Sequence, residues 1–334
     1  MQYNGCFRHC YTLNKLVKHC KELNLCMPQT ISSDLRYGEF RHMNKTNIFR
    51  VGILTFLCVF SFIFSPVHSV EITIQTVYVG GSGPGNYTRI QDALDNITVG
   101  ATVYVFPGTY HEHLIITTPV HLIGDNKDGT IIDGDNENYV VILKADNSTL
   151  SRFTIIQSEK KFPFSGIYVV SNHNTISNNI LTENFYGMQL GHTASYNLIA
   201  NNTIFNNGRC GIYFNHASYN ILVDNIVSDH PVNGFGLFEF SNNNNIMNNT
   251  FSENRYAGVN IRESYDCKVI NNTFIENHVG LHLPSSEYRT IVRNNMYTDN
   301  VISVEEERDA FVFTVVMFAI LVFFVFLIFR KLSK

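Results

Sequence analysis

Apolar positions recur at fixed spacing between Thr175 and Asn300, in six successive segments that each carry two apolar columns. The first column contains Ile176, Ile199, Leu222, Ile246, Val269 and Val292, and the second contains Leu181, Ile204, Val227, Phe251, Phe274 and Tyr297. The two columns lie five residues apart, an odd number, so one straight strand of period two cannot bury both. The chain must therefore bend between them.

The bend falls at a pair of polar residues, Asn-Asn or Asp-Asn. The second members of these pairs are 23 or 24 residues apart: Asn179, Asn202, Asn225, Asn249, Asn272 and Asn295. After Gly, Asn best tolerates the left-handed backbone conformation that a sharp bend needs. A fixed period of this length indicates a solenoid, a propeller or an array. In stacked coils these Asn residues would form a ladder of amides, hydrogen-bonded from coil to coil.

Five of the six segments also contain a Gly followed by alternating apolar positions, as in Gly187-Met188-Gln189-Leu190 and Gly211-Ile212-Tyr213-Phe214. This alternation indicates a strand with one buried face. Helical repeats are longer, at about 33 to 34 residues, and the leucine-rich frame is absent. We therefore predict an all-β fold, a right-handed parallel β-helix with about 22–24 residues and three short strands per coil.

The two ends of the chain predict targeting and anchoring segments. Residues 43–69 contain an apolar run after basic residues and are predicted to be a signal peptide or signal anchor. Residues 311–329 carry no charge and predict a transmembrane helix. The basic tail 330–334 then lies in the cytoplasm, which leaves the β-helix domain, 70–305, extracytoplasmic. Residues 1–42 share no pattern with the rest and are treated as an N-terminal extension.

Composition narrows the range of partners. The 334 residues have a formal net charge of -4, and the repeats show no basic stripe, so nucleic acid is not an expected partner. The expected partners are a membrane, through the C-terminal helix, and a polysaccharide or another envelope protein outside the cell.

Several strings near the start of the repeats resemble a known family. Residues 87–94, with Pro107-Gly108-Thr109-Tyr110 and Ile131-Ile132-Asp133-Gly134, resemble the N-terminal part of pectin-lyase-like right-handed β-helix proteins. The Asn-Asn-Thr and Gly-Ile-Tyr repeats look like the NosD group, described as periplasmic copper-binding, and like carbohydrate-binding and sugar-hydrolase repeats. The resemblance covers residues 75–302. It implies the fold but no single activity, because this fold hosts many. Independently of the resemblance, Ile90, Ala93 and Leu94 would share one face of a helix, which predicts a short helix over 89–94 that covers the first coil.

A second polar column follows each Asn pair. Its members are acidic residues or Asn, each followed by Asn or His: Glu183, Asn206, Asp229, Glu253, Glu276 and Asp299, then Asn184, Asn207, His230, Asn254, Asn277 and Asn300. We interpret these residues as turn residues that hydrogen-bond to their own backbone. One coil departs from the column, because it offers Asp224, Asp229 and His230 together. Two carboxylates and an imidazole near one turn are typical of acid–base chemistry on a glycan. A solvated turn that has drifted in sequence explains them equally simply.

A possible metal site comes from counting five residues past each strand Gly. His192 and His216 would then lie in adjacent coils, about 4.8 Å apart, with Glu239 next in the row. Two imidazoles and a carboxylate can share a copper or zinc ion, although polar residues at strand ends are more often plain surface.

A possible glycan surface lies on the same strands. We expect five side chains to face outward there: Tyr168, Gln189, Tyr213, Asn260 and His282. Aromatic rings pack on pyranose faces and amides bind hydroxyls. Sequons at Asn86, Asn96 and Asn147 fall in predicted loops and are candidate glycosylation sites.

The chain lacks the Asp-Asp, Gly-His-Gly and Arg-Ile-Lys strings of similar polygalacturonases and the Asp-Pro-His string of alginate epimerases. Our first hypothesis is therefore a membrane-anchored extracytoplasmic β-helix that binds a glycan or an envelope partner without catalysis. The alternatives are a polysaccharide lyase, hydrolase or epimerase, and a NosD-like copper-handling factor.

Overall fold

The computed structural model describes residues 75–283 and 289–306. The predicted extension 1–42, signal segment 43–69, transmembrane helix 311–329 and tail 330–334 lie outside these residues, as do the first residues of the predicted β-helix domain. Within the described ranges, no helix has the length and apolar character that a membrane span requires.

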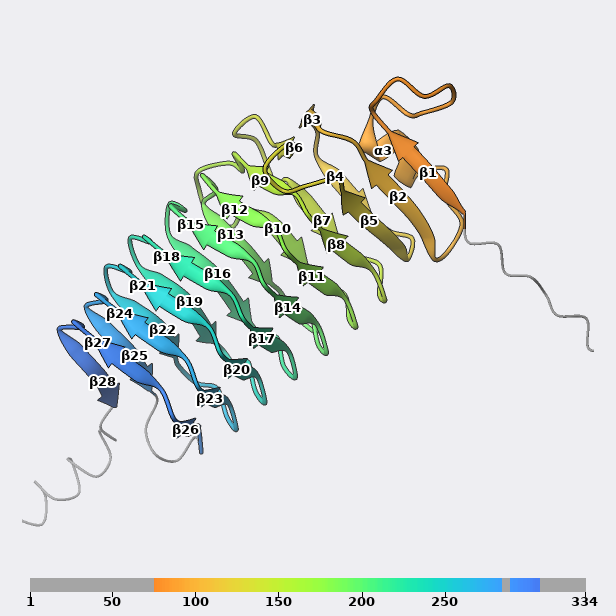
Figure 1. Ribbon diagram of the computed structural model, residues 1–334. Coiled ribbons are helices and arrows are strands. Elements are labelled where there is room, and N and C mark those ends of the chain that lie inside the picture. Colours follow the sequence, from red (N-terminus) through yellow and green to blue (C-terminus); the bar gives the residue numbers. More distant parts are fainter. Residues whose placement is uncertain (1–74, 284–288, 307–334) are drawn as a thin grey trace, which may run out of the picture. The chain divides into compact units, whose positions relative to one another are not determined.

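Three parallel sheets, named A, B and C here, stack coil on coil in a right-handed β-helix (Figure 1). Sheet A contains ten strands: β1 (Thr76–Val79), β2 (Ala101–Val105), β5 (Val120–Gly124), β8 (Thr149–Ser151), β11 (Thr175–Ser177), β14 (Leu198–Ala200), β17 (Ile221–Val223), β20 (Asn245–Met247), β23 (Lys268–Ile270) and β26 (Ile291–Arg293).

Sheet B contains nine strands, each of which follows a strand of sheet A along the chain. They are β3 (Gly108–His111), β6 (Thr130–Asp133), β9 (Thr154–Ile156), β12 (Ile180–Thr182), β15 (Thr203–Phe205), β18 (Ile226–Ser228), β21 (Thr250–Ser252), β24 (Thr273–Ile275) and β27 (Met296–Thr298).

Sheet C also contains nine strands and completes each coil. They are β4 (Leu114–Ile116), β7 (Val141–Leu143), β10 (Ser165–Val169), β13 (Tyr186–Leu190), β16 (Cys210–Asn215), β19 (Asn233–Phe238), β22 (Ala257–Ile261), β25 (Val279–Leu283) and β28 (Ile302–Glu306). The prediction of three short strands per coil is confirmed.

The core runs along the inside of the coils. The register pairs Ile176 with Ile199 in sheet A and Leu181 with Ile204 in sheet B, so both predicted apolar columns point inward. At the C-terminal end the second column becomes aromatic, and Phe274 stacks on Phe251 with ring centroids 5.5 Å apart. These stacked side chains supply the apolar burial that holds neighbouring coils together.

The predicted Asn ladder stands at the corner between sheets A and B. The first residue of each pair has a positive φ, as at Asn178 (58°), and the second turns inward and is buried, except for the half-buried Asn295 in the last coil. Asn202 is representative: its backbone N–H and its Nδ2 both donate to Oδ1 of Asn225, at 2.9 and 3.0 Å. Its Nδ2 also donates to the Ile176 carbonyl. Since a buried backbone group without a partner is costly, the ladder is what makes so tight a corner possible.

Two further ladders follow the other corners, which corrects our interpretation of the second polar column. Asn184, Asn207, His230, Asn254, Asn277 and Asn300 form a second ladder between sheets B and C. A third ladder, at the entry to sheet A, contains Asn174, Asn197, Asn220 and Asn244. These amides bond mainly from coil to coil, and only in part to their own turn as expected.

Helix α3 (Ile90–Leu94) covers the first coil, as predicted for residues 89–94. Ile90, Ala93 and Leu94 are buried, and the Glu112 carboxylate accepts hydrogen bonds from the backbone N–H groups of Ile90 (2.7 Å) and Gln91 (3.0 Å). A carboxylate from another coil thus satisfies the first helical N–H groups, which have no partner within the helix.

Candidate functional site

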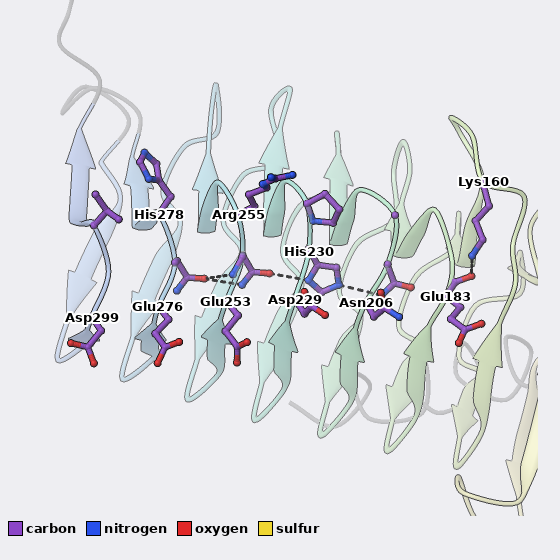
Figure 2. Close-up of a pocket in the computed structure, with 16 residues that line it drawn as sticks. Lys160, Glu183, Asn206, Asp229, His230, Glu253, Arg255, Glu276, His278 and Asp299 are labelled. Carbon is purple, nitrogen blue, oxygen red and sulfur yellow. Dashed lines mark hydrogen bonds between the residues drawn. The ribbon is translucent and has the colours of Figure 1, made fainter.

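A groove of about 870 Å³ runs along the corner between sheets B and C, and we call it the corner groove. Its lining residues come from successive coils, between Lys160 and Val301. Figure 2 shows its two sides: a row of acidic side chains on one side of the second ladder, and Lys160, Arg255 and His278 on the other.

The acidic row consists of the residues that precede the second ladder: Glu183, Asn206, Asp229, Glu253, Glu276 and Asp299. Every member is exposed and has a φ between 50° and 58°. This left-handed residue turns the chain from sheet B into sheet C, so its side chain projects out while the next residue turns in. Because the coils are in register, neighbouring members lie one strand spacing apart, about 4.8 Å. The sequence identified this column as turn residues, with Asp229 alone singled out for acid–base chemistry.

The opposite side of the corner groove is less regular. Lys160, Pro231, Arg255 and His278 are exposed there, and the Lys160 ammonium donates a hydrogen bond to the backbone carbonyl of Glu183. Although the Lys160 side chain as a whole is exposed, partial desolvation of its amino group lowers the pKa of Lys160. Five lining carboxylates outnumber the Lys and Arg side chains of the lining, so the groove is negatively charged.

His230, a predicted acid–base residue, lies inside the second ladder and is 1% exposed. Its Nδ1–H donates to Oδ1 of Asn254 at 2.9 Å, and its Nε2 accepts from Nδ2 of Asn207 at 3.2 Å. Desolvation lowers the pKa of His230 to about 4, so the ring is neutral near pH 7. Both ring nitrogens are therefore engaged, and this geometry does not support the predicted proton transfer.

The structure also separates the predicted carboxylates. Asp224 lies at the corner between sheets A and B and Asp229 at the corner between sheets B and C, with strand β18 between them. Only Asp229 lines the corner groove.

The predicted metal residues do come together. The rings of His192 and His216 stack with centroids 4.3 Å apart, and Nδ1 of His216 lies 3.6 Å from a Glu239 oxygen. A closer contact joins Nδ1 of His216 to Oδ1 of Asn215, at 2.8 Å. Imidazole lone pairs lie in the ring plane, so two stacked rings do not point at one ion. This trio does not fit a copper or zinc centre without rotation of the rings.

The predicted glycan row is in register across sheet C, with Tyr168 beside Gln189 and Gln189 beside Tyr213. Contrary to the expected exposure, Gln189 (7%), Asn260 (4%) and His282 (5%) are buried. Tyr168 is half-buried and stacks on Tyr139. Gln189, Asn260 and His282 therefore do not form an open surface for a sugar. The alternation along a strand predicts the direction of a side chain, but it does not predict which neighbouring residues cover that side chain.

Tyr213 is half-buried and lines a smaller groove of about 430 Å³ on sheet C. The lining of this groove is mixed in charge, with Arg209 and Arg262 near Glu239 and Glu263. Cys210 also lines this groove; its thiol is buried, and burial raises its pKa to about 11, so it is protonated near pH 7.

The predicted sequons lie at the surface in different degrees. Asn96 and Asn147 are exposed, whereas Asn86 is half-buried and its Nδ2 donates to the Gly80 carbonyl at 2.6 Å. Glycosylation of all three remains a prediction.

Solved structures with a similar fold show the fold class of this protein. The pectate lyase Pel9A aligns with a TM-score of 0.54 and 18% identity, over 72% of this chain and 80% of the lyase. The catalytic domain of a GH87 alpha-1,3-glucanase in complex with nigerose aligns with a TM-score of 0.52 and 17% identity, over 70% of this chain and 47% of that domain. Escherichia coli ybhc aligns at 10% identity with a TM-score of 0.50, over 70% of this chain and 87% of that one. At such identities the likeness shows the fold alone, a pectin-lyase-like right-handed β-helix.

The family follows from the sequence match. Residues 123–313, more than half of the chain, match the family described as periplasmic copper-binding protein (NosD). The chain belongs to the NosD family, and the predicted resemblance is confirmed. The periplasmic description of the family agrees with the predicted extracytoplasmic location of the β-helix. No protein of curated function matches the chain.

Proposed function

We propose that the protein is a membrane-anchored, extracytoplasmic β-helix that binds a glycan chain along the corner groove without cleaving it. The observation that carries this proposal is the row of exposed polar side chains, one per coil, of which five are carboxylates and one is Asn206, beside Arg255 and His278. A pyranose ring is close in length to the spacing between coils, so an extended glycan can meet an equivalent acceptor at each coil.

The charge of the corner groove selects among glycans. Carboxylates accept hydrogen bonds from sugar hydroxyls, and hydrogen bonds to a charged partner are the stronger kind. The same carboxylates repel uronic acids, because five of them lie along one groove. The favoured ligands are therefore uncharged or amino-bearing glycans, and polyuronates are disfavoured.

Two observations favour binding without cleavage. His230, the imidazole closest to the acidic row in sequence, is buried in the second ladder, and both of its ring nitrogens are hydrogen-bonded, to Asn207 and Asn254. Asp224 lies at another corner. Structural neighbours named pectate lyase and alpha-1,3-glucanase make a carbohydrate ligand a reasonable class, and the predicted helix 311–329 would hold the domain at a membrane.

The test is a polysaccharide panel in which retention and chain cleavage are measured together on the purified protein. We expect retention by neutral or amino-bearing polymers, weaker retention by polyuronates, and no cleavage. The double variant Glu253→Gln, Glu276→Gln removes two adjacent carboxylates and should weaken retention about tenfold or more. Glu263→Gln is the control, because Glu263 has the same left-handed conformation outside the corner groove.

Each other outcome contradicts a stated part of the proposal. Cleavage by the purified protein would refute the non-catalytic role. Unchanged retention in the double variant would remove the corner groove as the site, and a preference for polyuronates would refute the charge argument.

A further inference from the structure

Three metal-binding side chains meet on the same corner, in the coils before the corner groove begins. His111 ends strand β3 and Asp133 ends strand β6, and the two are directly paired in register. Asp135 follows in the turn. Nδ1 of His111 lies 2.8 Å from Oδ1 of Asp135 and 3.9 Å from Oδ2 of Asp133. One donor atom from each residue falls within 4.8 Å of the other two.

The carboxylate of Asp133 is held in place by a hydrogen bond to one of its two oxygens. Its Oδ1 accepts a hydrogen bond from the backbone N–H of Asp135 at 2.9 Å, which fixes the side chain. Asp133 is only 7% exposed, yet among the described residues no hydrogen bond engages its Oδ2, which points toward His111. Because the Asp135 N–H engages only Oδ1, Oδ2 is free to coordinate a cation beside the exposed His111 ring.

The turn that carries Asp135 is also fixed. Asp135 and Asn136 have φ values of 50° and 61°, and the backbone N–H of Asn136 donates to the Gln157 carbonyl at 2.8 Å. The backbone N–H of Glu137 closes the turn on the Gly134 carbonyl, also at 2.8 Å. The third donor is therefore set by the backbone rather than by a free loop.

We propose that His111, Asp133 and Asp135 hold a divalent transition-metal ion, with one imidazole nitrogen and two carboxylate oxygens as protein ligands and water in the remaining positions. Metal–ligand bonds of about 2.0 to 2.2 Å place tetrahedral ligand atoms roughly 3.3 Å apart. The separations of 2.8 and 3.9 Å lie on either side of that value, so small rotations of exposed His111 and Asp135 complete the site.

The donor set identifies the class of ion. Calcium and magnesium prefer oxygen ligands, and calcium takes six to eight of them, so a three-residue site with an imidazole suits them poorly. Thiolate or thioether ligands, which select copper(I), are absent from the trio. One imidazole with two carboxylates suits Zn²⁺ or Cu²⁺. This site is distinct from His192 and His216, whose rings stack instead of converging.

A competing explanation is a simple ion pair between protonated His111 and the two aspartates. The two explanations differ in what they need: the ion pair needs no metal, whereas the metal site binds one with defined stoichiometry. Direct metal titration separates them.

The experiment is isothermal titration calorimetry of the purified, chelator-treated protein with ZnCl₂, with Cu²⁺ electron paramagnetic resonance as a second readout. We expect a Zn²⁺ ion whose binding is weakened at least tenfold in both His111→Gln and Asp133→Asn, and a Cu²⁺ spectrum that loses a nitrogen ligand in His111→Gln. Asp133→Asn keeps an oxygen acceptor for the Asp135 N–H, so the turn is retained. His121→Gln, which replaces an exposed histidine on sheet A, is the control and should bind as the unaltered protein does.

Circular dichroism first shows that each variant keeps its β-sheet content. Zinc should raise the unfolding temperature of the unaltered protein and of His121→Gln. In His111→Gln and Asp133→Asn the same zinc concentration should raise the unfolding temperature less, because the proposed site is impaired. Equal Zn²⁺ affinity in His111→Gln and the unaltered protein, or no loss of nitrogen coupling in the Cu²⁺ spectrum, would overturn the proposal. A result in which Asp133→Asn alone binds normally would also overturn it, because the buried carboxylate is the fixed point of the site.

Discussion

Replacement of His230 by Asn should make the β-helix less sensitive to acid. His230 occupies a ladder position that Asn fills in the neighbouring coils, between Asn207 and Asn254. An amide there restores the same pair of coil-to-coil hydrogen bonds but cannot take up a proton near pH 5. His230 and Asn254 also occupy equivalent places against the glycines of sheet C. A Cβ added to Gly211 would touch the His230 ring, just as a Cβ added to Gly234 would touch the Asn254 amide.

The size of the effect follows from the pKa values. The pKa of His230 falls from 6.5 in the unfolded chain to about 4 in the folded one, because burial disfavours the imidazolium. Between these values the unfolded chain binds the extra proton, so the free energy of unfolding decreases as the pH falls. At pH 5 the loss is about 2 kcal/mol, from roughly 1.4 kcal/mol for each pH unit below 6.5. At pH 7 the loss is close to zero, since neither state is protonated.

The assay is urea unfolding followed by circular dichroism at pH 7 and pH 5. On moving to pH 5, we expect His230→Asn to gain about 2 kcal/mol relative to the unaltered protein. His121→Asn, at an exposed histidine, should follow the unaltered protein at both pH values. If His230→Asn and the unaltered protein lose the same stability between pH 7 and pH 5, then His230 is not buried as a neutral ladder member.

Two further predictions concern the ladder and two glycines that lie in strands. Asn225→Ala should lower the free energy of unfolding by about 3 kcal/mol or more, because it leaves buried hydrogen-bond partners in two adjacent coils without a partner. The control Asp224→Asn, at the exposed neighbouring residue, should be nearly neutral. Equal effects of the two variants in urea unfolding would refute the ladder's role. Gly258→Ala should cost about 1 to 3 kcal/mol, because its Cβ would lie 2.7 Å from the Gly280 carbonyl oxygen, whereas Gly108→Ala finds its nearest neighbour at 3.5 Å. Similar melting temperatures for these two variants would contradict the packing argument.

The repeating part of the fold could be predicted from the sequence because each coil repeats the same physical problem. Apolar columns such as Ile176 and Leu181 five residues apart demand a corner, and Asn178 with Asn179 supplies one. The third ladder escaped prediction because its column is interrupted, where Cys267 replaces Asn and donates through its sulfur to the Ser241 carbonyl. Sequence spacing does not show whether a polar turn residue bonds within its own coil or to the next one.

The candidate sites were harder to predict, for a different reason in each case. His230 looked like a departure from the Asn column, yet an imidazole with one donor and one acceptor can substitute for an amide in a ladder. Gln189 faces outward as its alternation requires, but its burial depends on neighbours from other coils. The cluster at His111 and Asp133 depends on register in the first coils, where spacing is irregular and no repeat indicates which residues pair.

At the corner between sheets B and C, one residue of each coil is exposed to a ligand and the next residue stabilises the fold. At Glu253 and Asn254, the left-handed residue projects an exposed carboxylate into the groove, while the next residue supplies the buried amide on which the coil depends. The first position is therefore free to vary in charge and chemistry at little cost to folding, and the second is not. The same corner carries the acidic row and, earlier in the chain, Asp133 and Asp135, where the buried Asp133 carboxylate precedes the left-handed, exposed Asp135 and accepts a hydrogen bond from its backbone N–H. Changes of ligand specificity in this protein should therefore map to the left-handed positions of this corner, and losses of stability to the residues that follow them.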